Sequence, residues 1–204
     1  VYLHVTPKLY QTLPLYSNLQ TTGTYVYARE IDITNKSAQI FAETQVKNEL
    51  PAEKNVELEV KIEDPDGKII KTFKSKPEKI ASGEMKSIKA HNKVSDLHFW
   101  SWGYGYLYNV YTTLIVDGKP SDVVKTRTGF RKTRFDKGMF WLNDRVLQIK
   151  GYAERTTNEW PAQGQSVPAW LSDYSNKMMV ESNANTVRWM HVTPWKQDVE
   201  SCDR

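Results

Sequence analysis

The chain has 204 residues, of which 39% are apolar, 25% charged and 12% aromatic. This composition is that of a globular protein, and the length allows one large domain or one domain and part of another. The 28 basic and 24 acidic residues leave a net charge of +4. The charges are interspersed, so no segment has the concentrated basic charge of a nucleic-acid-binding surface. No apolar run reaches the length of about 18 residues that a membrane-spanning helix needs.

Residues 1–134 are predicted to form strands and turns. The clearest strand runs from Val56 to Ile62, where apolar residues alternate with charged ones. This period of two predicts a strand with one buried face, and the turn Asp64-Pro65-Asp66-Gly67 after it predicts a hairpin with residues 69–73. Further strands are expected near residues 25–31, 38–47, 85–90, 106–116 and 123–127. About seven strands at this spacing are typical of a two-sheet, immunoglobulin-like sandwich.

The pattern changes near residue 135. A short hairpin is expected over residues 140–149, and a long loop follows it. A helix is then predicted with Ser172 as its N-cap, then a strand over residues 186–190, then a second helix opened by Thr193-Pro194. Strands that alternate with helices indicate a parallel sheet or barrel. One and a half such units cannot close an eight-stranded barrel, so we expect only the start of this domain.

Metal and disulfide chemistry have little support in the sequence. Cys202 is the single cysteine of the chain, so an intrachain disulfide and a cysteine-cluster metal site are both excluded. The four histidines, at positions 4, 91, 98 and 191, have no ligand spacing. We therefore expect neither a metal site nor another cofactor.

Short motifs follow one another in a fixed order from residue 106 to the end of the chain. They include Tyr106-Leu107-Tyr108, Thr128-Gly129-Phe130-Arg131, Phe140-Trp141-Leu142-Asn143, Ile149-Lys150-Gly151, Asn183 to Arg188, and Cys202-Asp203-Arg204. In order and spacing they resemble glycoside hydrolase family 2, which includes β-galactosidases, β-glucuronidases and β-mannosidases. The resemblance implies a mainly β fold class. Residues 1–134 would form an immunoglobulin-like antiparallel β-sandwich, and residues 135–204 the truncated start of a (β/α)8 barrel.

The resemblance also implies an activity, that of an O-glycosyl hydrolase. Such a parent enzyme would cleave β-linked glycosides with retention, and we expect it to be β-galactosidase-like. Retaining enzymes use two carboxylates about 5–5.5 Å apart. In the family both glutamates lie on later barrel strands, so we expect them beyond Arg204 and expect the fragment alone to be inactive. A carbohydrate is the implied partner, and a glycan-degrading parent favours a periplasmic or secreted location. The apolar surface of the unfinished barrel allows self-association.

Five residues are candidate substrate ligands on this resemblance. His191 follows the second barrel strand and matches a family histidine that contacts the sugar; alternatively, it hydrogen-bonds the backbone of a loop. Arg188 could reach the substrate or a catalytic carboxylate, or else fill an ion pair inside the barrel. Glu154 and Arg155, at the end of the first barrel strand, could bind sugar hydroxyls or an anionic sugar, or form a surface ion pair. Trp160, in the loop that follows, is a candidate stacking platform.

Two loops depart from the family pattern. Many members have Gly-x-Asn-Arg-His-Glu where this chain has the run from Gly151 to Thr156, and Arg-x-x-His-Tyr-Pro where it has the longer run from Arg188 to Pro194. Because these loops line the pocket in the family, the sugar stays open. The alternative function is a non-catalytic immunoglobulin-like module that binds carbohydrate or protein. The residues after 135 argue against it, because a free-standing module needs no appended helix and strand.

Overall fold

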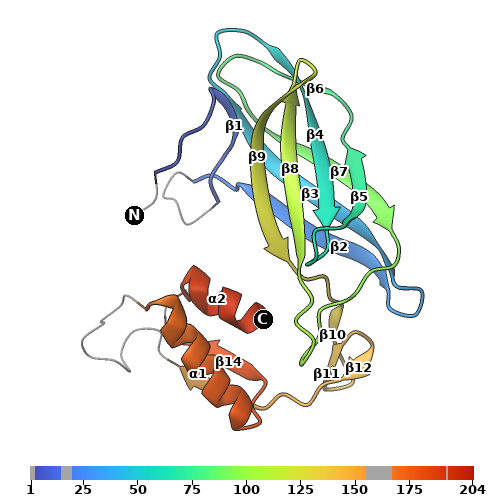
Figure 1. Cartoon of the computed structure of the whole chain (residues 1–204), viewed down its shortest axis with the longest axis vertical. Helices are drawn as coiled ribbons and strands as arrows, with labels where there is room; N and C mark the ends of the chain where they lie inside the picture. Colours follow the sequence, from blue (N-terminus) through green and yellow to red (C-terminus); the bar gives the residue numbers. More distant parts are fainter. Residues whose placement is uncertain (1–2, 15–19, 155–166, 192) are drawn as a thin grey trace. The chain divides into compact units, whose positions relative to one another are not determined.

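The structure is a computed structural model of the chain, and it describes residues 3–14, 20–154, 167–191 and 193–204. The chain divides into two compact units (Figure 1). The first comprises Val1–Phe99 and Leu107–Phe130, and the second comprises Trp100–Tyr106 and Arg131–Arg204. The domain boundary expected between residues 134 and 135 stays a prediction.

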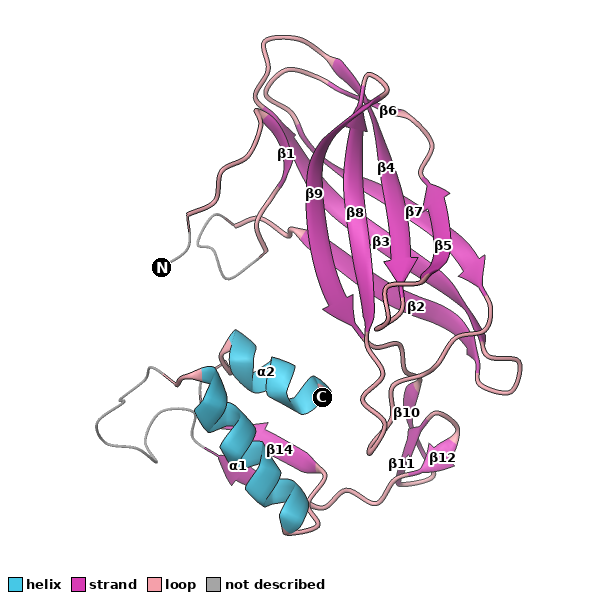
Figure 2. Ribbon diagram, in the orientation of Figure 1, coloured by secondary structure: helices cyan, strands magenta, loops and turns pink. Residues whose placement is uncertain are grey.

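The first unit is a sandwich of two antiparallel sheets (Figure 2). In the first sheet, sheet A, β3 lies between β7 on one edge and β1 and β2 on the other. In the second, sheet B, β4 pairs with β8, β5 and β6, and β9 pairs with β8. The strands of sheet A are β1 (Leu9–Gln11), β2 (Thr24–Asp32), β3 (Ser37–Asn48) and β7 (Met85–Val94). The strands of sheet B are β4 (Lys54–Glu63), β5 (Ile69–Lys74), β6 (Glu78–Ile80), β8 (Tyr108–Val116) and β9 (Lys119–Thr128).

The core of the sandwich follows from the alternation that the sequence shows. Every second residue of β3 and β4 is buried, as expected when one face of each sheet packs against the other sheet. Side chains with no exposed surface include Ile40, Val46, Val56, Leu58, Val60 and Ile62. The strands predicted near residues 25–31, 38–47, 56–62, 69–73, 85–90, 106–116 and 123–127 are therefore confirmed, although β7 continues to Val94. The short strands β1 and β6 were not predicted.

A polar cluster lies inside this apolar core and joins the two sheets. The side-chain amide of Gln11, in sheet A, donates to the carbonyl of Thr112 in sheet B at 2.9 Å. The Thr112 hydroxyl donates back to Gln11 Oε1 at 2.8 Å, and the Thr44 hydroxyl donates to the same oxygen at 3.0 Å. All three side chains are buried. Each buried polar group thus has a partner, which avoids the cost of leaving it unpaired.

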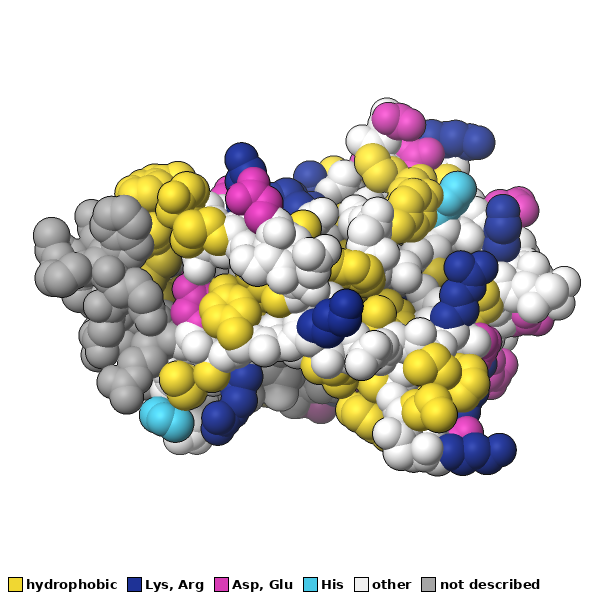
Figure 3. Space-filling view, turned by 90° about the horizontal axis from the view of Figure 1, so that it is seen from below, with side chains coloured by type: hydrophobic (Ala, Val, Ile, Leu, Met, Phe, Trp, Pro, Cys, Tyr) yellow, Lys and Arg dark blue, Asp and Glu magenta, His cyan; other side chains and the backbone are white. Residues whose placement is uncertain are grey.

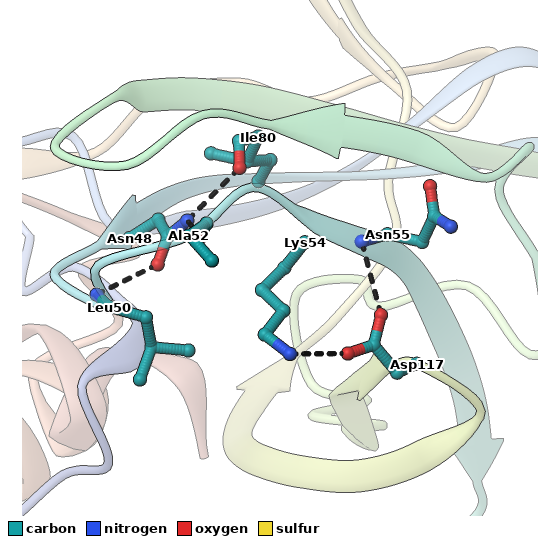
Figure 4. A network of polar contacts seen from close by, with 7 residues as sticks. All are labelled: Asn48, Leu50, Ala52, Lys54, Asn55, Ile80 and Asp117. Carbon is teal, nitrogen blue, oxygen red and sulfur yellow. Dashed lines mark hydrogen bonds and ion pairs between the residues drawn. The ribbon is translucent and has the colours of Figure 1, made fainter.

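A second polar anchor holds the loops at one end of the sandwich (Figure 4). Asn48 is fully buried, and its side-chain nitrogen donates to the carbonyls of Ala52 and Ile80 at 3.0 Å. Its side-chain oxygen accepts from the Leu50 backbone at 3.0 Å. Nearby, Lys54 and Asp117 form an ion pair at 2.7 Å. Asn48 therefore replaces the backbone partners that these irregular residues lack.

The second unit combines a small antiparallel sheet with a parallel pair of strands and two helices. The antiparallel sheet contains β10 (Thr133–Asp136), β11 (Met139–Leu142) and β12 (Arg145–Val146). The parallel pair is β13 (Gly151–Glu154) and β14 (Thr186–Trp189), and the helices are α1 (Ala169–Glu181) and α2 (Lys196–Asp203). The predicted hairpin is present, but its second strand ends at Val146. The predicted strand over residues 186–190 is confirmed.

Segment Trp100–Tyr106 belongs to this unit although it precedes the last two strands of the sandwich. The indole nitrogen of Trp100 donates to the Asp203 carbonyl at 2.7 Å, and the Asn143 side chain donates to the Trp100 carbonyl at 2.9 Å. The guanidinium of Arg131 lies 5.2 Å from the centre of the Trp100 ring. Trp100 therefore links the hairpin β11–β12 to the end of α2.

Both predicted helix starts were wrong. Helix α1 begins three residues before Ser172, with Pro168 at the N-cap, and Ser172 lies inside the helix. Helix α2 begins at Lys196 with Trp195 at the N-cap, so Thr193 and Pro194 precede it. In both cases the cap was chosen by residue type, whereas the Ser172 hydroxyl bonds to Asp198 of α2 instead. No helix among the described residues is long and apolar enough to cross a membrane.

Candidate functional site

The predicted site residues lie at the parallel pair, whose two faces differ. Ala153 of β13 stands opposite Arg188 of β14, and Glu154 stands opposite Trp189. Because side chains alternate along a strand, Tyr152 and Glu154 share one face with Trp189, while Ala153 and Arg188 share the other. The first group is half-buried and the second is exposed. The pair thus has one covered face and one uncovered face.

Glu154 belongs to the covered face and is held by two hydroxyl groups. Ser175, from α1, donates to one carboxylate oxygen, and Tyr152 donates to the other at 3.1 Å. Burial raises the pKa of Tyr152 to about 12, and the neighbouring Glu154 charge contributes to the rise. The phenol therefore stays protonated at neutral pH and remains a hydrogen-bond donor to Glu154. The carboxylate is directed toward α1.

The two helices of the unit meet through polar groups. The buried Ser172 hydroxyl of α1 donates to the buried Asp198 carboxylate of α2 at 2.6 Å. The other Asp198 oxygen accepts from the Trp195 backbone at 2.9 Å, so Asp198 also caps its own helix. Burial raises the pKa of the nearby Cys202 thiol to about 11. Asp198 therefore fixes the start of α2 and the contact between the helices.

Arg188 and His191 are exposed at the end of β14. Within the described ranges, no acidic side chain forms an ion pair with Arg188. The Met190 backbone donates to the Glu154 carbonyl at 2.9 Å, which continues the parallel pairing one residue beyond β14. His191 follows directly, at the carboxyl end of the strand, and the peptide bond before it is cis. An exposed guanidinium and an exposed imidazole are groups that can bind anions or hydroxyls.

The structure does not gather all predicted ligands on one surface. Arg188 is exposed on the uncovered face, whereas the Glu154 carboxylate is directed to the covered face, so the two do not form an ion pair. Arg155 and Trp160 lie outside the described residues. Sequence reasoning missed Tyr152 and Ser175, although the spacing of Tyr152 two residues before Glu154 predicts that both share a face. No group of three metal-binding side chains occurs among the residues that the structure describes.

The comparisons with known proteins all indicate the same family. Residues 24–131 match the model of glycosyl hydrolases family 2. A β-glucuronidase of Formosa agariphila is 34% identical over 205 residues, which cover 100% of this chain and 21% of that protein. The β-galactosidase BoGH2A of Bacteroides ovatus is 26% identical over 184 residues, which cover 89% of this chain and 21% of that protein.

Solved structures give the same result. A β-glucuronidase from glycoside hydrolase family 2 superposes with a TM-score of 0.87 at 34% identity, over 97% of this chain and 20% of that one. A β-glucuronidase of Bacteroides uniformis has a TM-score of 0.82 at 24% identity, over 97% of this chain and 23% of that one, and shows the fold alone. The chain thus spans about a fifth of the length of the relatives it matches.

Proposed function

The chain belongs to glycosyl hydrolases family 2, and from this membership we propose that it is part of a retaining β-glycosidase. The sandwich is its immunoglobulin-like domain, and the second unit opens its catalytic (β/α)8 barrel. Relatives of the chain are glycosidases, so the parent activity is that of a glycosyl hydrolase. In this proposal the two catalytic glutamates lie beyond Arg204, and the residues that this chain contributes contact the substrate at the rim of the active site.

The barrel proposal rests on the parallel pair and its two faces. In a (β/α)8 barrel each strand is followed by a helix, and its side chains point alternately to the helices and to the barrel interior. Here β13, α1, β14 and α2 follow in that order, and among the described residues Ala153 and Arg188 on one face of the strand pair are exposed while Tyr152, Glu154 and Trp189 on the other are half-buried. The uncovered face, with Ala153 and Arg188, then corresponds to the barrel interior. The carboxyl end of β14, where His191 follows, corresponds to the active-site end.

The proposed substrate is a β-glucuronoside. The observation that carries this choice is the exposed Arg188, which has no acidic partner among the described residues. A guanidinium at the barrel interior can bind the carboxylate of a uronic acid with two parallel hydrogen bonds. The similarity to a β-glucuronidase supports the choice. A β-galactoside, which the sequence favoured, is the second candidate, because the Bacteroides ovatus relative is a β-galactosidase.

The predicted ligands receive different roles in this proposal. Arg188 and His191 contact the sugar directly. Glu154 positions the end of β13 through Tyr152 and Ser175, since contact with the sugar would require its carboxylate to leave both hydroxyls. Arg155 and Trp160 remain proposed substrate contacts on the sequence resemblance.

The test uses the complete protein encoded by the reading frame that contains this chain. We expect 4-nitrophenyl β-D-glucuronide to be cleaved faster than the β-D-galactoside, with retention of configuration measured by NMR. Arg188→Ala should lower kcat/KM for the glucuronide about 10–100-fold, the effect of losing a hydrogen bond to a charged group, and Arg188→Lys should lower it less. Arg145→Ala, which removes an exposed arginine of the same unit, is the matched control. Equal losses on both substrates would assign Arg188 to an ion pair within the barrel.

The 204-residue chain alone should be inactive on both aryl glycosides. Turnover that copurifies with the chain and disappears with Glu154→Gln would place a catalytic carboxylate inside it and contradict the proposal. Self-association is a further expectation, because α1 and α2 expose apolar side chains among polar ones (Figure 3). They include Trp170, Met178 and Val180 of α1 and Val199 of α2. A monomer at all concentrations in analytical ultracentrifugation would argue against it.

A further inference from the structure

The outer face of sheet A carries a continuous row of stacked rings. Tyr27 of β2, Phe41 of β3 and His91 of β7 stand opposite one another across three neighbouring strands. Their ring centres are 5.1 Å and 4.9 Å apart, and Tyr25 stacks on Tyr27 at 4.9 Å. Tyr25 is 64% exposed although it is a large aromatic residue. These rings, together with Arg29 and Lys93, are called the ladder face below.

The charges on the ladder face are mostly positive. Arg29 lies 5.3 Å from the centre of the Tyr27 ring and 5.5 Å from that of Phe41. Lys93 stands at the end of the next cross-strand row, and both cations are exposed. Glu43 of β3 is paired with Lys89 at 2.9 Å and accepts from the Tyr27 hydroxyl. Asp32 at the end of β2 is held by Asn35, and these hydrogen bonds, together with the charge of Lys93, lower the pKa of Asp32. In the part of the chain that the structure describes, neither Arg29 nor Lys93 has an ion-pair partner.

The outer face of sheet B has the ring of Tyr111 in place of a row of stacked rings, and ion pairs lie beside it. There Lys74 lies between Glu57 and Glu59 at 3.6 and 3.5 Å, and Lys61 pairs with Glu63 at 2.7 Å. Acidic and basic side chains therefore neutralise one another on β4 and β5, whereas Lys125 and Arg127 of β9 form no ion pair among the described residues. Lys61 and Lys125 lie 4.7 and 5.7 Å from the centre of the Tyr111 ring. Sheet A differs in its row of stacked rings, beside which Arg29 and Lys93 form no ion pair with any described residue. Contact with water is unfavourable for such exposed aromatic surface, so a ligand that covers it is favoured.

We propose that the ladder face binds an acidic polysaccharide. An extended sugar chain can lie along the sheet, with C–H groups against the exposed ring of Tyr25 and the ring edges of Tyr27 and Phe41, and with its anionic groups beside Arg29 and Lys93. The hydroxyl of Tyr25 and the imidazole of His91 add hydrogen bonds to sugar hydroxyls. Carboxylates and sulfates share the chemistry that a guanidinium and an ammonium recognise. The inference goes beyond the proposed reaction, because it concerns binding by the sandwich and is measured without hydrolysis.

The experiment measures binding of the 204-residue chain by affinity electrophoresis and calorimetry. The probes are polygalacturonate for carboxylates, dextran sulfate for sulfates, and dextran as the neutral polysaccharide. We expect binding to at least one acidic probe and none to dextran. Replacing Arg29 and Lys93 together by alanine should weaken that binding about tenfold, which corresponds to about 1.4 kcal/mol.

The matched control removes one lysine and one arginine from the outer face of sheet B. The double variant Lys125→Ala, Arg127→Ala lowers the net charge by the same amount as the double variant of the ladder face. It should leave binding unchanged, because both residues lie on sheet B. Tyr27→Ala tests the rings, and it should weaken polysaccharide binding while poly-glutamate binding, if any, stays the same. Circular dichroism identifies any variant that does not fold. If Tyr27→Ala does not fold, Tyr27→Phe replaces it. This variant keeps the ring and should retain most of the binding.

Three outcomes would overturn the proposal. The first is absence of binding to both acidic probes. The second is equal binding to poly-glutamate or to duplex DNA, because the surface would then attract any polyanion. The third is equal weakening by the sheet A and sheet B variants, which would remove the ladder face from the interaction. A dimer that dissociates on Arg29→Ala and Lys93→Ala would assign the face to a second copy of the chain, again against the proposal.

Discussion

The sandwich and the second unit differ in how their strands and helices pack. In the sandwich, both sheets bury one face against each other, and side chains such as Leu58 and Ile40 are completely enclosed. In the second unit, α1 and α2 meet through Ser172 and Asp198, and one face of the parallel pair remains uncovered. The closed apolar core of the sandwich is formed by the chain's own residues. The exposed face of the parallel pair, which carries Arg188, is available for contacts with other residues or with a ligand.

The largest effect should come from the core of the sandwich. Leu58→Ala removes a side chain with no exposed surface from the middle of β4. We expect the free energy of unfolding to fall by about 2–5 kcal/mol, measured by chemical denaturation, because the substitution loses apolar burial and leaves a cavity. Val123→Ala is the control on β9, since Val123 is 54% exposed, and it should change the stability by less than about 0.5 kcal/mol. Similar losses for both variants would mean that the sandwich is not the closed unit described here.

The next effect concerns the polar anchor at Asn48. Asn48→Ala leaves the carbonyls of Ala52 and Ile80 and the Leu50 amide without their partner. The expected loss is about 1–3 kcal/mol in the free energy of unfolding, the cost of leaving a buried polar group unpaired. Asn55→Ala is the matched control. The backbone N–H of Asn55 donates to Asp117, and the Asn55 side chain points away from Asp117 (Figure 4). If both variants unfold at the same denaturant concentration, the anchor contributes nothing.

The difference between the units also explains what the sequence could predict. Strands such as β3 and β4 were found because each buries one face, and the resulting alternation is visible in the sequence. The fully buried Asn48 was not found, because an asparagine beside an irregular loop looks like any surface residue. Short strands such as β6 have three residues, too few for a period to be recognised.

In the second unit, the order of strands and helices was predictable but the starts of the helices were not. Ser172 has the residue type of an N-cap, yet its hydroxyl is engaged by Asp198, which lies 26 positions further along the chain. Local residue preferences cannot include such a partner. The site residues were predicted from a resemblance, and the face on which each lies became known only from the pairing of β13 with β14.

The smallest effect tests the contact between α1 and α2 through Cys202. Burial raises the pKa of this thiol from 9.0 to about 11, and the charge of Asp203 adds to the rise. At pH 9 the thiol of the folded chain is therefore mostly protonated, so alkylation by iodoacetamide should be roughly fiftyfold slower than in the denatured chain. The folded state binds this proton more tightly than the unfolded state. Its contribution to stability is therefore full below pH 9 and is lost as the pH rises toward 11. Asp198→Asn weakens the contact between the helices and removes a charge that raises the pKa of the Cys202 thiol, so it should speed the alkylation, whereas Glu200→Gln, on the same helix, should not. Equal rates in the folded and denatured chain would show that α2 is not held against α1 in solution.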